Sequence, residues 1–174
     1  MSMIKFMVGI SSLIPTSLLA IFKLSGGEIG PFYWLLQGVV FLVTFFALLI
    51  VFLYLVQTRL YFVYPTRQLN AIRKYYLEKD KQDFEYNQMY TNYRFSAFKW
   101  MSTHTFIIFG VSIISTVFWI GGVLSLATYF GVESKWGVSL ISGFILLVLS
   151  NFLAGRYLKN KSRLAADDAV HGSK

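Results

Sequence analysis

His104 is the residue of this sequence best placed for acid–base chemistry, because it lies between the hydroxyl side chains of Thr103 and Thr105. A histidine next to a hydroxyl can act as the base that activates an oxygen nucleophile. Such a base needs an acidic residue to orient its ring, and none lies nearby in the sequence. We therefore interpret His104 as a structural histidine at the mouth of a membrane span.

Metal binding is the second chemistry to consider, because Asp80, Asp83 and Glu85 lie close together in the chain. This stretch lacks the ligand spacing and the glycine of a calcium-binding loop, and a charged turn of this kind is usually just solvated. We interpret Asp167 and Asp168 in the same way.

The remaining candidates for a metal or phosphate site are also weak. His104 and His171 have no third histidine or carboxylate at ligand spacing, and the absence of cysteine excludes thiolate ligands. Gly26, Gly27 and Gly30 are not preceded by a strand or followed by a Lys-Ser/Thr pair, so they indicate a turn and not a phosphate-binding loop. The sequence therefore predicts no catalytic residue, no cofactor and no metal.

The elements that must position these residues are predicted to be membrane helices. Of the 174 residues, 56% are apolar and only 14% are charged, whereas a soluble domain carries about 25% charge. A bilayer span takes about 20 apolar residues, and the charge-free stretches 35–56, 101–132 and 136–155 are each long enough. We predict spans at approximately residues 33–57, 102–130 and 136–156.

A further span is predicted at approximately residues 4–24, where the apolar stretch is shorter and contains Pro15. A proline kinks a membrane helix without forbidding it, which favours a retained span. The small residues Thr16, Ser17 and Ala20 leave a cleaved signal peptide open as an alternative. A re-entrant or interfacial helix is the third alternative.

Basic residues gather in residues 57–103 and in the tail from residue 156 onward. The other loops hold only Lys23 and Lys135, offset by Glu28 and Glu133. The positive-inside rule therefore predicts a multi-pass protein of the cell membrane with both termini in the cytoplasm. Because the basic residues lie just beyond span ends, we expect anionic lipid headgroups as partners and do not expect nucleic acid.

The polar residues 58–101, between the second and third spans, are predicted to form a cytoplasmic helical hairpin. Pro65 fits the start of its first helix, in which Leu69, Ile72 and Tyr76 share one face. The second helix is indicated by residues that recur at helical spacing, namely Tyr86, Tyr90, Tyr93, Ala97 and Trp100.

A seam of aromatic side chains can close the hairpin, lie along the membrane surface, or bind a protein partner or a second copy of the chain. The residues that we expect to make such contacts are Tyr86, Tyr90, Tyr93 and Trp100 on the seam, and Arg67, Arg73 and Lys74 on the basic face.

Small residues at four-residue spacing within the spans predict close helix packing. The pairs are Ser112 with Thr116, Gly121 with Ser125, and Ser139 with Gly143, and Asn151 is placed to bond across a helix interface. Such patterns are common to multi-span proteins, so they do not identify an oligomer.

The sequence thus predicts an all-α, polytopic integral membrane protein. We expect a four-transmembrane-helix bundle, a cytoplasmic helical hairpin between spans 2 and 3, and a basic, flexible tail over residues 157–174. The predicted function is that of a non-enzymatic assembly, accessory or regulatory subunit, which acts through its hairpin on a protein partner.

The alternative function is a homo-oligomeric pore or permeability effector lined by hydroxyls, Gln37 and Asn151. This build is similar, in architecture alone, to that of small membrane effectors of bacterial defence systems. A membrane enzyme or single-chain transporter is disfavoured, because the spans hold no ionisable residue deep in their apolar stretches.

Overall fold

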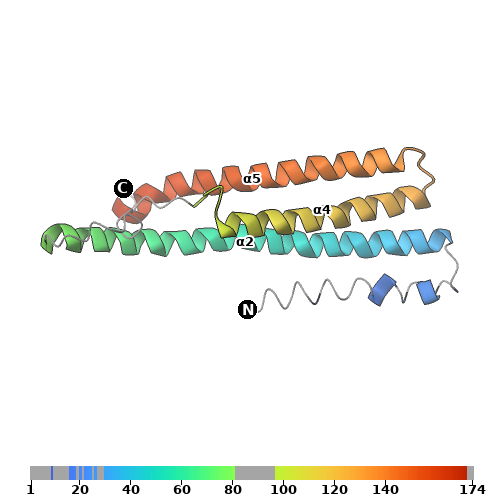
Figure 1. The fold of residues 1–174 in the computed structure, drawn as a ribbon, viewed down its shortest axis with the longest axis horizontal. Helices are drawn as coiled ribbons and strands as arrows, with labels where there is room; N and C mark the ends of the chain where they lie inside the picture. Colours follow the sequence, from blue (N-terminus) through green and yellow to red (C-terminus); the bar gives the residue numbers. More distant parts are fainter. Residues whose placement is uncertain are drawn as a thin grey trace. The chain divides into compact units, whose positions relative to one another are not determined.

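The computed structural model describes residues 30–80 and 97–171, together with residues 9, 16–18, 20, 22–24 and 26. Within this part of the chain there is no strand, and the long helices are α2 (Pro31–Asp80), α4 (Thr103–Tyr129) and α5 (Lys135–His171) (Figure 1). All three are long and apolar enough to cross a membrane. The all-helical class is confirmed, and the three helices support a membrane protein.

α2 is longer than a bilayer span requires. Its 50 residues make a helix of about 75 Å, whereas the hydrocarbon core of a bilayer is about 30 Å thick. Pro31 lies in its first turn, where a missing N–H is harmless. The helix continues without a break through Pro65. α2 therefore combines the predicted second span with a helical extension that begins near Arg59.

The ends of α4 are fixed by side-chain and backbone caps. The backbone N–H of Thr105 donates to Oγ of Ser102 over 3.3 Å, which is the arrangement of a helix N-cap. At the other end Gly131 has a φ of 69°, and the N–H of Val132 donates to the carbonyl of Ala127 over 2.9 Å. This is the Schellman pattern, in which glycine adopts the left-handed conformation without steric cost.

The chain divides into two compact units, and parts of all three helices contribute to each. The first unit comprises residues 1–52 and 110–150, and the second unit comprises residues 53–109 and 151–174.

Glycines allow α2 and α4 to approach closely in the first unit. A Cβ atom at Gly38 would lie 3.3 Å from the backbone nitrogen of Leu126, and one at Gly122 would lie 3.4 Å from the backbone nitrogen of Leu42. Membrane helices commonly associate through such small residues, because burial away from lipid gives little driving force. Neither Gly38 nor Gly122 stood out in the sequence.

Two of the small residues that the sequence did single out also lie at helix contacts. The ring of Phe41 occupies the space in which a Cβ of Gly121 would lie, and Ile120 does the same at Gly143. The predicted close packing is therefore confirmed at these two positions.

Hydroxyl groups of the first unit mostly bond within their own helix. The residues that donate to the carbonyl four positions earlier are Thr44, Thr116, Ser125, Thr128 and Ser139. Two bonds join α4 to α5: Ser112 with Ser150 at 3.1 Å, and Trp119 Nε1 to Ser142 Oγ at 3.2 Å. In lipid, polar groups must find their partners inside the protein.

The structure differs from the sequence prediction in two described segments. Residues 157–171 continue α5 as a helix where a flexible tail was expected, and Leu158 is buried there. Residues 97–102 form turns where the second helix of the hairpin was expected, because the chain must enter the Ser102 cap of α4. The predicted span 4–24 and the rest of the second helix of the hairpin lie mostly outside the described residues. The four-span count and the hairpin therefore remain predictions.

Candidate functional site

Arg67 lies at the centre of a buried polar link in the second unit. Its side chain is only 1% exposed. One terminal nitrogen donates to the backbone carbonyl of Ser162 over 2.9 Å and the other to the Ser162 hydroxyl over 2.6 Å. The same hydroxyl accepts the backbone N–H of Ala97 over 3.3 Å. A buried charge is tolerated when hydrogen bonds replace its hydration, so this link joins α2, α5 and the segment before α4.

Further polar contacts join α2, the segment before α4 and the first turn of α4. Arg59 Nε donates to the carbonyl of Ala97 over 3.1 Å. His104 Nε2 lies 3.0 Å from the carbonyl of Leu55, and because a carbonyl only accepts, this ring nitrogen carries the proton. The hydroxyl of Thr105 donates to the carbonyl of Lys99 over 2.8 Å.

Beyond Arg59, the buried face of α2 combines apolar and polar residues, and most of its large aromatic residues are exposed. The buried positions follow helical spacing and are Leu60, Val63, Arg67 and Asn70. The exposed face, which we call the outer stripe, consists of Tyr61, Phe62, Leu69, Ile72, Tyr75 and Tyr76. A helix that packs onto a soluble core usually exposes polar residues instead. The outer stripe extends over about 22 Å of helix.

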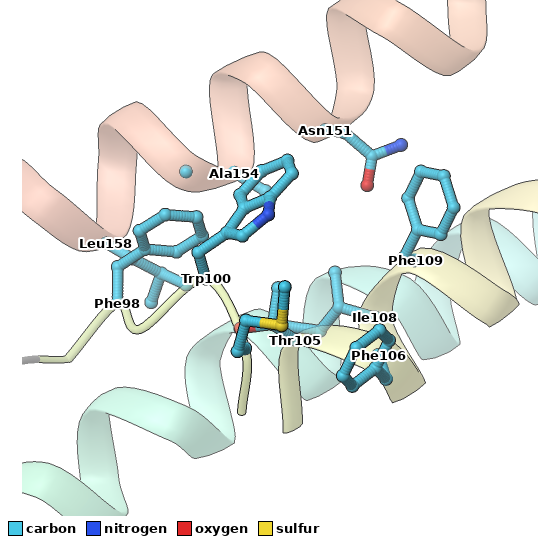
Figure 2. Close-up of a pocket in the computed structure, with 11 residues that line it drawn as sticks. Phe98, Trp100, Thr105, Phe106, Ile108, Phe109, Asn151, Ala154 and Leu158 are labelled. Atoms are coloured by element: carbon cyan, nitrogen blue, oxygen red, sulfur yellow. The ribbon is translucent and has the colours of Figure 1, made fainter. Parts of the chain in front are cut away.

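An apolar pocket of about 210 Å³ lies elsewhere in the second unit. It is formed by residues 98–101, the first two turns of α4 and residues 151–158 of α5. Figure 2 shows Phe98 beside Leu158 at one end, Asn151 facing Phe109 at the other, and Trp100 between them. Thr105 and Asn151 are its polar lining residues.

The structure separates the residues that the sequence grouped as contact candidates. Arg67 is buried, so its side chain stabilises the fold and is not available for contact with a partner. Arg73 is exposed and Lys74 half-buried on α2, whereas Trp100 is 73% exposed at the pocket. Tyr86, Tyr90 and Tyr93 lie outside the described residues.

Sequence reasoning missed the buried link and the pocket. Arg67 was read as one of several surface cations, and Ser162 lies in a stretch that was read as flexible tail. The signal that was available is spacing: Leu60, Val63, Arg67 and Asn70 fall on one helical face. Apolar and polar residues share that face, which hides it from a search for amphipathic patterns.

A small cavity of about 20 Å³ in the first unit is lined in part by hydroxyls. These belong to Ser112, Ser115, Thr116 and Ser150. The Ser115 hydroxyl oxygen is buried and has no partner among the described residues. The space is sufficient for about one water molecule. Among the described residues no group of histidine, cysteine and acidic side chains is arranged to hold a metal ion.

In comparisons with protein-family models, curated proteins and solved structures, none matches this chain.

Proposed function

We propose that this chain is a non-enzymatic accessory subunit of a membrane complex, which binds a partner protein on the cytoplasmic side through the outer stripe of α2. One observation carries the proposal: six large apolar or aromatic side chains point outward on the part of α2 that follows Arg59. An exposed apolar surface outside the bilayer core is typical of a protein interface. Tyrosine adds contact area with a polar end.

The charge of α2 indicates the chemistry of the partner. From Arg59 to Tyr76 every charged residue of the helix is basic, and Arg73 is exposed beside the outer stripe. A complementary surface is apolar at its centre and acidic at its edge. The partner that fits is therefore a protein with an acidic, amphipathic face.

The continuity of α2 argues against a stripe that lies flat on the membrane surface. A helix that leaves a span and then lies in the headgroup plane needs a break between the two parts. α2 has none between Pro31 and Asp80. The outer stripe therefore belongs to the same unbroken helix as the predicted span.

The homo-oligomeric pore receives less support than the accessory subunit. A hydroxyl-lined path needs serine and threonine side chains on the outside of each chain. Instead Ser112, Thr116, Ser125 and Ser139 are buried, and the last three donate to carbonyls of their own helix.

The non-enzymatic part of the proposal rests on His104 and its neighbour. The protonated ring nitrogen of His104 is engaged by Leu55, and the Thr105 hydroxyl is engaged by Lys99. Both groups thus donate to backbone carbonyls and not to each other as a base and nucleophile pair would, although Thr105 lines the apolar pocket.

Photo-crosslinking in native membranes tests the proposal. A benzophenone amino acid replaces Ile72 on the outer stripe or, as the matched control, Tyr54, which is also exposed on α2 but lies in the charge-free stretch. We expect the position 72 probe to yield one stoichiometric adduct with a foreign protein, and the position 54 probe to label lipid. The added substitution Tyr76→Glu should lower the position 72 yield at least about tenfold, as loss of a central interface contact does.

Other adducts would contradict the proposal in distinguishable ways. An adduct of twice the chain mass at native expression favours self-association and thereby the pore. Crosslinks confined to residues 81–96 of the same chain show that the hairpin closes on the outer stripe. Equal labelling from positions 54 and 72 shows that both face lipid.

A further inference from the structure

The apolar pocket of the second unit has the size and lining of a site for a hydrocarbon chain. Its volume of about 210 Å³ is roughly seven times the ~30 Å³ that a water molecule occupies in the liquid. Aromatic and aliphatic side chains form most of the wall, including Phe98, Trp100 and Leu158 (Figure 2). Such a wall offers dispersion contacts along a flexible chain and few hydrogen bonds.

The pocket lies at the point along α5 where an apolar span becomes a basic helix. The charge-free stretch of α5 ends at Gly155, and Arg156 is the first charged residue after it. The residues of α5 that line the pocket run from Asn151 to Leu158 and so cross this boundary. The exposed indole of Trp100 is typical of the headgroup level. A bilayer therefore presents both acyl chains and phosphates at this depth.

Exposed basic residues are next in sequence to residues that line the pocket. Lys99 lies between the lining residues Phe98 and Trp100, and Arg156 and Lys159 follow lining residues on α5; all three basic residues are exposed. The sequence has no acidic residue between Glu85 and Glu133, or between Glu133 and Asp167. Both segments that form the pocket are thus positively charged at their edges.

We propose that the pocket binds one acyl chain of an anionic phospholipid, whose phosphate is held by Lys99 and Lys159. The hydrocarbon chain replaces water against an apolar wall, and the charged residues of these segments are all basic. This site is separate from the outer stripe of α2 and does not depend on the proposed partner.

Quenching of tryptophan fluorescence by brominated lipids tests this site in the full chain. The chain contains Trp34, Trp100, Trp119 and Trp136, so one variant retains Trp100 alone and a matched control retains Trp136 alone. Each is reconstituted in phosphatidylcholine vesicles with an equal, small fraction of acyl-brominated phosphatidylglycerol or acyl-brominated phosphatidylcholine. At about 1 kcal/mol per basic side chain, we expect the anionic lipid to be enriched about fivefold or more at Trp100, and not at Trp136.

Substitutions in and around the pocket separate its two parts. A Cβ atom at Gly155 would lie 3.7 Å from the Phe98 ring, an ordinary contact, and the rest of the side chain in Gly155→Leu is intended to occupy the pocket. The same change at Gly137 of α5, where nothing lies within 4 Å, is the control. Gly155→Leu should reduce quenching of Trp100 to that given by bulk lipid, while Gly137→Leu should leave it unchanged. Lys99→Gln with Lys159→Gln should remove the preference for phosphatidylglycerol.

Two results would overturn the proposal. Equal quenching of Trp100 by the two brominated lipids shows that the basic residues select no headgroup. Enhanced quenching that persists in a folded Gly155→Leu variant, verified by circular dichroism, shows that the chain lies outside the pocket.

Discussion

The two units of this chain differ in the hydrogen bonds that most of their buried polar side chains make. In the first unit, hydroxyls such as those of Thr44 and Ser139 donate to a carbonyl one turn earlier in the same helix. In the second unit, Arg67 donates to Ser162, 95 residues away in the sequence. The first kind of bond satisfies a polar group without joining helices, whereas the second kind holds separate segments together.

This difference in hydrogen bonding follows from the apolar residues of the first unit and the charged residues of the second. Where lipid surrounds the helices, apolar burial contributes little, so close packing at Gly38 and Gly122 must hold α2 against α4. Where α2 and α5 carry charge, hydrogen bonds between segments can replace hydration. We therefore expect stability to depend on glycine packing in the first unit and on tertiary hydrogen bonds in the second.

Arg67→Ala should have the largest effect on stability. It removes two charge-assisted hydrogen bonds from a buried site. The Ser162 carbonyl then loses the donor that Arg67 supplied, and a cavity forms, which together cost about 3 kcal/mol or more of unfolding free energy. The measurement is the free energy of unfolding of the full chain by SDS in mixed micelles, followed by circular dichroism. Arg67→Lys should lie between the wild type and Arg67→Ala, because an ammonium cannot reproduce both contacts of the guanidinium.

The control for this prediction is Arg73→Ala. Arg73 belongs to the same basic group in the sequence but is exposed on α2. Exposed substitutions usually change stability by less than about 0.5 kcal/mol. Similar losses at both positions would show that the buried link does not hold the second unit together.

The contrast between Arg67 and Arg73 also shows what the sequence could predict. Long charge-free stretches fix the helical, membrane class, because a span must satisfy its backbone internally. The four-residue spacing of small residues located Gly121 and Gly143 at helix contacts. It could not tell Arg67 from Arg73, because burial depends on Ser162, whose position relative to α2 is decided by tertiary folding. The pocket likewise combines segments that are about 50 residues apart in the chain.

Gly122→Ala should have an intermediate effect and tests the packing of the first unit. The new Cβ would lie 3.0 Å from Cγ of Leu42 and 3.4 Å from its backbone nitrogen. The Leu42 side chain must shift by a few tenths of an ångström in a packed contact, which costs about 1–3 kcal/mol. Gly110→Ala on the same helix has nothing within 4 Å, so it should leave stability unchanged or raise it by up to about 1 kcal/mol. The same SDS unfolding experiment compares them, and equal results would exclude close packing as the basis of the α2–α4 contact.

Two matched serine substitutions compare the units most directly, and the smallest effect is expected from the second of them, Ser139→Ala. Ser162→Ala removes an acceptor from Arg67 and from the N–H of Ala97, and a buried donor that loses its acceptor costs about 1–3 kcal/mol. Ser139→Ala removes a hydroxyl that is fully buried but donates only to Lys135 of its own helix. The helix already pairs that carbonyl, so we expect a loss below about 0.5 kcal/mol. If Ser139→Ala proves as costly as Ser162→Ala, burial of the hydroxyl matters more than the segments it joins, and the distinction between the two units fails.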